Sequence, residues 1–104
     1  MHSKQTALLM DCFDLLADIP LRNNKEQKEL AQSIIDTLGN YPKPQHKNEE
    51  KETNPTELGA YLYTSTARNF AKLFLLGYTP FKNALNAIIS NLENALGLLT
   101  DERK

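Results

Sequence analysis

The chain has 104 residues and a mass of 11.8 kDa, which fits one domain built on one hydrophobic core and excludes a second domain. Twelve Lys and Arg residues against thirteen Asp and Glu residues give a formal net charge of −1, without the positive surplus that non-specific nucleic-acid binding requires. Cys12 is the only cysteine, so the chain cannot form an internal disulfide, and we expect a reducing, cytoplasmic location.

Uncharged stretches in this sequence are short. The longest cover residues 58–67 and 83–92, about ten residues each, whereas a membrane-spanning helix needs about 20. Asp11 and Asp14 interrupt the apolar segment near the N-terminus that a signal peptide would require. We therefore expect a soluble protein that does not insert into a membrane.

Apolar residues that recur every three or four positions predict a first helix over residues 4–18, ended by Pro20. Its core stripe comprises Leu8, Leu9, Cys12, Phe13, Leu15, Leu16 and Ile19. Either Asn23 or Asn24 caps a second helix, which we expect to end at Gly39 in the left-handed conformation. The stripe of this second helix comprises Leu30, Ala31, Ile34, Ile35 and Leu38.

Residues 41–54 contain two prolines and a charged run, which predict a flexible loop. A third helix over residues 55–77 then begins with Asn54 as its cap and Glu57 reaching back to it. Its predicted core stripe comprises Leu58, Tyr61, Leu62, Ser65, Phe70, Leu73 and Phe74. Small residues on this helix, namely Gly59, Ala60, Ser65 and Ala67, would let a neighbouring helix approach closely.

Gly77 is expected to end the third helix, with Thr79 as the cap of a fourth helix and Pro80 in its first turn. The fourth stripe comprises Phe81, Leu85, Ile88, Leu92, Ala95 and Leu99, and a short tail follows over residues 100–104. Four amphipathic helices with short connections predict an all-α fold, an antiparallel up-down-up-down four-helix bundle that forms one domain over residues 1–104.

The residues that carry most enzyme chemistry are few and scattered. His2 and His46 are far apart in the sequence, and Cys12 lies on a core stripe, so we expect neither a zinc site nor a catalytic nucleophile. Asp11 and Asp14 would raise the pKa of Cys12, which favours a buried structural thiol. Without a glycine-rich phosphate loop or a nucleophile motif, the sequence predicts no catalytic activity, no cofactor and no metal.

The remaining indications of function are the distribution of charge and the polar and aromatic residues expected at the surface. Residues 1–40 carry a net charge of −2 and residues 58–104 a net charge of +2. A helix-turn-helix interpretation of residues 69–92 is disfavoured, because the would-be recognition helix has Lys82 as its lone basic residue.

The fourth helix also has an uncharged polar face, Asn83, Asn86, Ser90 and Asn94, that could serve docking. For Tyr61 and Tyr78 we favour packing in the core or at its rim over contact with a partner.

The amino-acid sequence of the C-terminal half resembles that of one known family. Residues 58–68 (LGAYLYTSTAR), continued by Phe70 and Leu73, the Gly-Tyr-Thr-Pro turn at 77–80 and the apolar seam at 85–92, are similar to the third and fourth helices of the pediocin-like (class IIa) bacteriocin immunity proteins, the enterocin A immunity family. The resemblance implies an antiparallel four-helix bundle of about this length.

Members of that family are cytoplasmic, non-enzymatic proteins that protect a bacterium from a pore-forming peptide. The resemblance implies that this chain acts by stoichiometric binding to a mannose-type phosphotransferase permease in complex with bacteriocin, and so associates transiently with the inner face of the membrane. It further implies a partner-binding surface on the third and fourth helices, for which we select Arg68, Lys72, Tyr78 and Lys82. No nucleic acid is expected as a partner, and a monomer is favoured.

The alternative hypothesis is a small helical adaptor or regulatory protein that self-associates. Its dimer interface would use apolar residues beyond those needed for the core, namely Leu9, Leu76, Ile89 and Leu98. The two hypotheses differ in the expected oligomeric state, a monomer for the immunity protein and a dimer for the adaptor.

Overall fold

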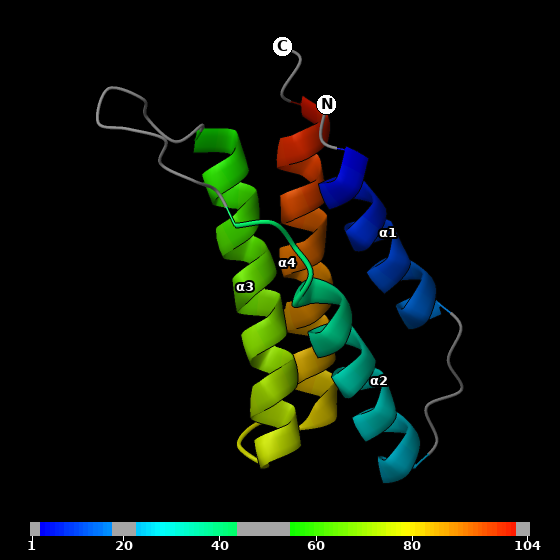
Figure 1. Cartoon of the computed structure of the whole chain (residues 1–104). Coiled ribbons are helices and arrows are strands. Elements are labelled where there is room, and N and C mark those ends of the chain that lie inside the picture. The colour runs from blue at the N-terminus through cyan, green and yellow to red at the C-terminus, as the bar shows by residue number, and fades with distance from the viewer. Residues whose placement is uncertain (1–2, 18–22, 44–54, 102–104) are drawn as a thin grey trace.

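The computed structural model describes residues 3–17, 23–43 and 55–101, and within these ranges the regular structure is entirely helical. The four helices are α1 (Ser3–Ala17), α2 (Asn24–Leu38), α3 (Pro55–Leu76) and α4 (Phe81–Asp101) (Figure 1). The predicted all-α class with four helices is therefore confirmed.

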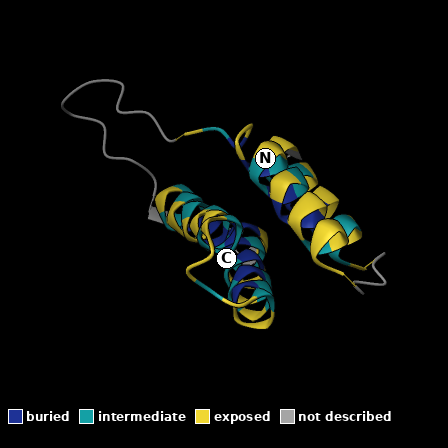
Figure 2. Ribbon diagram, turned by 90° about the horizontal axis from the view of Figure 1, so that it is seen from below, coloured by how far each residue is buried: buried dark blue, intermediate teal, exposed yellow. Residues whose placement is uncertain are grey.

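The helices are arranged as a bundle. Each helix contacts the next one along the chain, and α1 also contacts α4, which closes the ring. The contact between α3 and α4 is the most extensive of these. Figure 2 views the helices nearly end-on, with α1 and α2 as one pair and α3 and α4 as the other. The start of α1 and the end of α4 lie at the same end of the molecule (Figure 1).

The predicted stripes of α1 and α2 form half of the core. Leu9 and Cys12 are fully buried on α1, and the four buried residues of α2 are Leu30, Ala31, Ile34 and Leu38. Leu8, Phe13, Leu15, Leu16 and Ile35 pack against this core as partly buried side chains. These stripes are confirmed, apart from Ile19, which lies outside the described residues.

The two ends of α2 differ in how well they were predicted. Asn23 is the cap, since its side-chain oxygen accepts a hydrogen bond from the backbone N–H of Glu26 at 2.8 Å. The left-handed conformation expected at Gly39 is wrong, because its φ is −62° and its N–H donates to the carbonyl of Ile35 at 2.8 Å, as in a helix. The chain leaves through a tighter turn, in which the N–H of Tyr41 donates to the carbonyl of Leu38.

The predicted core stripe of α3 is wrong in its first half. Leu58 and Leu62 are exposed, and the fully buried residues are the small ones, Ala60, Ala67 and Ala71. Small side chains let the helix backbones approach closely, and the larger apolar residues then fall outside the contact. A Cβ atom added at Gly59 would lie only 3.0 Å from Cδ1 of Leu98 on α4, so the side chain of Leu98 packs directly over this glycine.

The stripe of α4 is confirmed. Ile88, Leu92, Ala95 and Leu99 are buried, while Phe81 and Leu85 are partly buried against the same core. The helix begins one residue later than expected. The carbonyl of Pro80 accepts the N–H of Ala84 at 3.0 Å, so Pro80 occupies the capping position that we assigned to Thr79.

Several predictions fall outside the described residues: the stop at Pro20, the charged part of the loop at 44–54 with the cap at Asn54, and residues 102–104 of the predicted tail. The start of that tail is wrong, because Thr100 and Asp101 belong to α4. Residues 41–43 of the predicted loop are described, and Tyr41 belongs to the buried core. None of the described helices is both long enough and apolar enough to cross a membrane.

Candidate functional site

The turn between α3 and α4 is held in one conformation by backbone hydrogen bonds. Gly77 has φ 90°, the left-handed conformation predicted for the end of α3. The N–H of Gly77 donates to the carbonyl of Phe74 at 3.0 Å, and the N–H of Tyr78 donates to the carbonyl of Leu73 at 2.9 Å. This pair of bonds is a Schellman motif, which satisfies the last carbonyls of the helix and fixes the direction of the chain after it.

Side-chain contacts across the turn add to this backbone motif. The rings of Phe74 and Phe81 meet edge to face, with centroids 5.1 Å apart. Between them the turn exposes two large apolar side chains, Leu76 at 69% and Tyr78 at 77% of their accessible surface. The expectation that Tyr78 packs in the core or at its rim is therefore wrong. Its backbone caps the helix, and its side chain faces solvent.

Two lysines accompany these exposed apolar residues. Lys72 is exposed on α3 four positions before Leu76, so the two share one face of the helix. Lys82 is exposed in the first turn of α4. We call Lys72, Leu76, Tyr78 and Lys82 the hairpin end. Tyrosine is a residue type enriched at protein interfaces, whereas lysine and leucine are not enriched there, so Tyr78 is the residue of the hairpin end that most favours contact with a partner.

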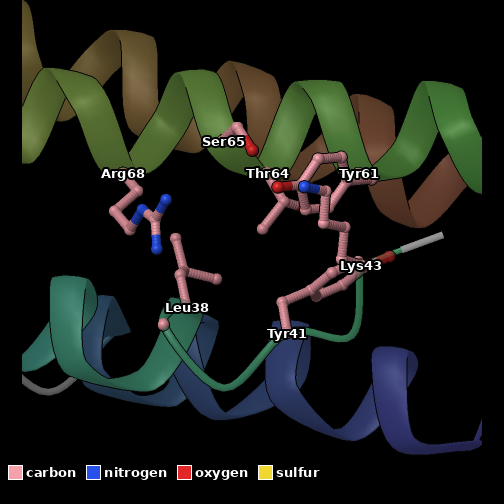
Figure 3. Close-up of a pocket in the computed structure, with 8 residues that line it drawn as sticks. Leu38, Tyr41, Lys43, Tyr61, Thr64, Ser65 and Arg68 are labelled. Carbon is pink, nitrogen blue, oxygen red and sulfur yellow. The ribbon is translucent and has the colours of Figure 1, made fainter. Parts of the chain in front are cut away.

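Arg68 does not belong to this exposed group, although the sequence placed it there. It is half-buried on α3, and its Nε atom is buried without a hydrogen-bond partner among the described residues. Of the four residues selected from the sequence, three are exposed near the hairpin end. The fourth, Arg68, lines a cavity between α3 and the end of α2 (Figure 3).

This cavity has a volume of about 190 Å³. Its lining residues come from the end of α2, the segment after it and the middle of α3: Leu38, Gly39, Tyr41, Lys43, Tyr61, Thr64, Ser65 and Arg68. In Figure 3, Arg68 extends from α3 towards Leu38, and Lys43 extends back towards Thr64. The rings of Tyr41 and Tyr61 form an aromatic wall, with centroids 6.3 Å apart. Two cations and four hydroxyl-bearing side chains thus line one small space.

Tyr41 is buried in this cavity with 8% of its surface accessible, and among the polar lining side chains only Thr64, at 2%, is buried more deeply. The Tyr41 hydroxyl has no hydrogen-bond partner among the described residues. Burial raises the pKa of Tyr41, and the charge of Glu57 raises it further. A hydrogen-bonding approach of the Thr64 side chain lowers the pKa in part, although the two hydroxyls do not meet full hydrogen-bond geometry. The phenol therefore stays protonated at neutral pH and can donate. The hydroxyl of Thr64 donates to the carbonyl of Ala60 at 2.8 Å, which leaves its oxygen as an acceptor.

The cavity is not predictable from helical periodicity, because Tyr41 and Lys43 lie in the segment that the prolines and charges predict to be a flexible loop. One signal was available, namely a tyrosine and a leucine on either side of the glycine that ends α2, since apolar residues just after a helix often fold back onto it. Tyr61 was expected to lie in the core or at its rim, and its half-buried ring in the cavity wall confirms this.

The other candidate residues give no second site. Cys12 is fully buried as predicted, and burial together with the charge of Asp11 raises its pKa to about 12. Within the described part of the chain, no group of His, Cys, Asp and Glu residues could hold a metal ion, and His2 and His46 lie outside that part. Leu9, one of four residues in the alternative dimer interface, is fully buried, so this part of the alternative is wrong.

Comparison with protein-family models, curated proteins and solved structures gave no match for this chain. Functional inference therefore rests on the two features described above. The first is the hairpin end, which is exposed and rigidly held. The second is the cavity beside α2, which is partly open to solvent and rich in hydrogen-bond donors.

Proposed function

We propose that this protein is a bacteriocin immunity protein that protects the bacterium carrying it from a pore-forming, pediocin-like peptide. In this proposal the four helices form an antiparallel up-down-up-down bundle in the cytoplasm. The protein binds stoichiometrically, from the cytoplasmic side, to the mannose-type permease that the peptide uses as its receptor, and no chemical bond is made or broken.

The observation that carries the proposal is the hairpin end. Leu76 and Tyr78 are the two most exposed of the large apolar side chains, and they lie together at a turn held by a Schellman motif and by the contact of Phe74 with Phe81. A rigid turn loses little conformational entropy on binding, so more of the contact energy appears as affinity. Tyrosine is among the residues that contribute most at protein interfaces.

The charges of the hairpin end supply a second argument. Lys72 and Lys82 are both exposed, and the C-terminal half of the chain is the more basic half. The inner leaflet of a bacterial membrane is anionic, so a basic surface favours an encounter with a partner embedded there. The same region contains the residues whose sequence resembles that of the immunity family.

The direct experiment is expression of the chain in a strain that pediocin-like peptides kill. We expect a higher killing concentration for at least one peptide of a panel, with no change for an unrelated pore former such as nisin. A strain that carries the empty vector is the control. Unchanged killing across the whole panel, with the protein shown to be present in soluble form, would overturn the proposal.

A further inference from the structure

The cavity between α3 and the end of α2 is a feature that partner binding at the hairpin end does not use. It brings together residues from two parts of the chain, Lys43 after α2 and Arg68 on α3, without a carboxylate among its lining residues (Figure 3). Glu57 acts electrostatically on Tyr41 from the first turn of α3 but does not line the cavity. Among the described residues, the lining therefore carries the positive charges of Lys43 and Arg68 and no negative charge.

Two polar atoms in this lining are buried without a hydrogen-bond partner among the described residues, the hydroxyl oxygen of Tyr41 and Nε of Arg68. A buried donor without a partner costs about 1–3 kcal/mol, so such groups are rare in folded proteins and call for an explanation. Two unpaired donors that line one cavity indicate a ligand that accepts hydrogen bonds there.

The kinds of donor restrict the chemistry of that ligand. A guanidinium group, an ammonium group and hydroxyl groups together match an oxyanion with several acceptor atoms, and Arg binds such groups through two parallel hydrogen bonds. Phosphate, with its double charge near neutral pH and its tetrahedral oxygens, meets more of these donors at once than a planar carboxylate does. A volume of about 190 Å³ exceeds the ~30 Å³ of one water several times, so a phosphate fits with a small attached group.

We propose that this cavity is a phosphate-binding site, in which Arg68 and Lys43 bind the anion and the Tyr41 hydroxyl donates a hydrogen bond to it. The ligand is inorganic phosphate or the phosphate group of a small molecule. The site is independent of the function proposed for the hairpin end. A protein that binds phosphate here could still be an immunity protein, and one that does not could be as well.

The experiment is a titration of the purified full chain with inorganic phosphate, followed by NMR chemical shifts, with chloride at equal ionic strength as the reference. We expect saturable binding, with the largest shifts at Tyr41, Ser65 and Arg68. Arg68→Gln should weaken binding about 10- to 100-fold, as expected for a lost charged hydrogen bond. Lys72→Gln is the matched control, because this exposed lysine lies one turn away and outside the cavity, and it should change affinity less than about twofold.

Tyr41→Phe keeps the test decisive if Arg68→Gln fails to fold. Removal of an unpaired buried hydroxyl should leave the melting temperature without phosphate unchanged or higher, while binding weakens several-fold. A merely structural hydroxyl would instead lower the melting temperature when removed. The proposal is overturned if the wild-type chain shows no saturable binding at millimolar phosphate. It is equally overturned if Lys72→Gln weakens binding as much as Arg68→Gln, since the effect would then be one of general charge.

Phosphate could also be presented by a lipid headgroup. Co-sedimentation with phosphatidylcholine vesicles, with and without phosphatidic acid, separates the two sources. Binding of free phosphate without sedimentation supports the site as one for a soluble ligand. In this assay Lys28→Gln is the control, because Lys28 is exposed on α2 outside both the cavity and the hairpin end. Sedimentation with phosphatidic acid that Arg68→Gln abolishes and Lys28→Gln preserves supports the same phosphate chemistry on a lipid. Sedimentation that both variants lose equally would contradict a specific site.

Discussion

Cys12 shows how strongly burial controls the chemistry of a single side chain in this protein. Its thiol is fully buried on α1, and its pKa rises from the ordinary value of 9.0 to about 12, first through desolvation and then through the charge of Asp11. The thiolate is the reactive form of cysteine, so the folded protein keeps this residue inert at neutral pH. Its role is to fill the core.

The raised pKa of Cys12 predicts a pH effect on stability. Above pH 9.0 the thiol ionises in the unfolded chain, whereas in the folded chain it keeps its proton up to about pH 12. The contribution of this residue to stability is therefore fully present below pH 9.0 and is lost as the pH rises towards 12. Urea unfolding across this range should show a steeper loss for the wild type than for Cys12→Ala. Parallel curves for the two proteins would contradict the raised pKa.

Individual buried residues were predictable from the sequence only where large apolar side chains recur. The position of Cys12 follows from its place on the stripe of α1. The environment of Tyr41 does not follow in the same way, because it depends on where α3 passes relative to a segment that has no periodicity. The cavity is a product of tertiary packing, and no local pattern encodes it.

At the scale of helices, the sequence predicted some helix ends and some buried faces correctly and others wrongly. Gly77 ends α3 as predicted because a left-handed residue is needed there, whereas Gly39 remains right-handed because a tighter turn ends α2. On α3, the contact with its neighbours uses alanines, and Leu62 is left 54% exposed. The hydrophobic pattern alone predicted that Leu62 would be buried. This pattern cannot distinguish a helix face that packs through large side chains from one that packs closely through small ones.

Two glycines should respond to the same substitution in opposite directions. Gly77→Ala places a Cβ atom at φ 90° and should destabilise the protein by about 1–2 kcal/mol. Gly97→Ala lies inside α4, where an added Cβ atom meets nothing within 4 Å, and should stabilise it by about 0.5–1 kcal/mol. Denaturant midpoints of both variants give the comparison. Shifts of the same sign would show that the conformation of Gly77 is not what holds the turn.

At the scale of the whole molecule, the two features lie in separate regions and have opposite character. The cavity is a recess between α2 and α3, while the hairpin end is exposed where α3 turns into α4. Four helices packed in a ring give both of them rigid support. Such a scaffold suits a protein that works by binding, since it positions surfaces and does not require a moving part.

Protection by hairpin-end variants tests the central claim most directly. The variant combines Lys72→Glu, Tyr78→Ser and Lys82→Glu. Its matched control combines Lys25→Glu, Lys28→Glu and Tyr63→Ser, which make the same chemical changes at exposed positions on α2 and α3. Circular dichroism melts first establish that both fold.

The measured quantity is the concentration of pediocin-like peptide that kills a sensitive strain expressing each protein. The account predicts that the wild type and the control raise this concentration, and that the hairpin-end variant leaves it at the level of the empty vector. Equal protection by the hairpin-end variant and the control, or no protection by the wild type, would contradict it.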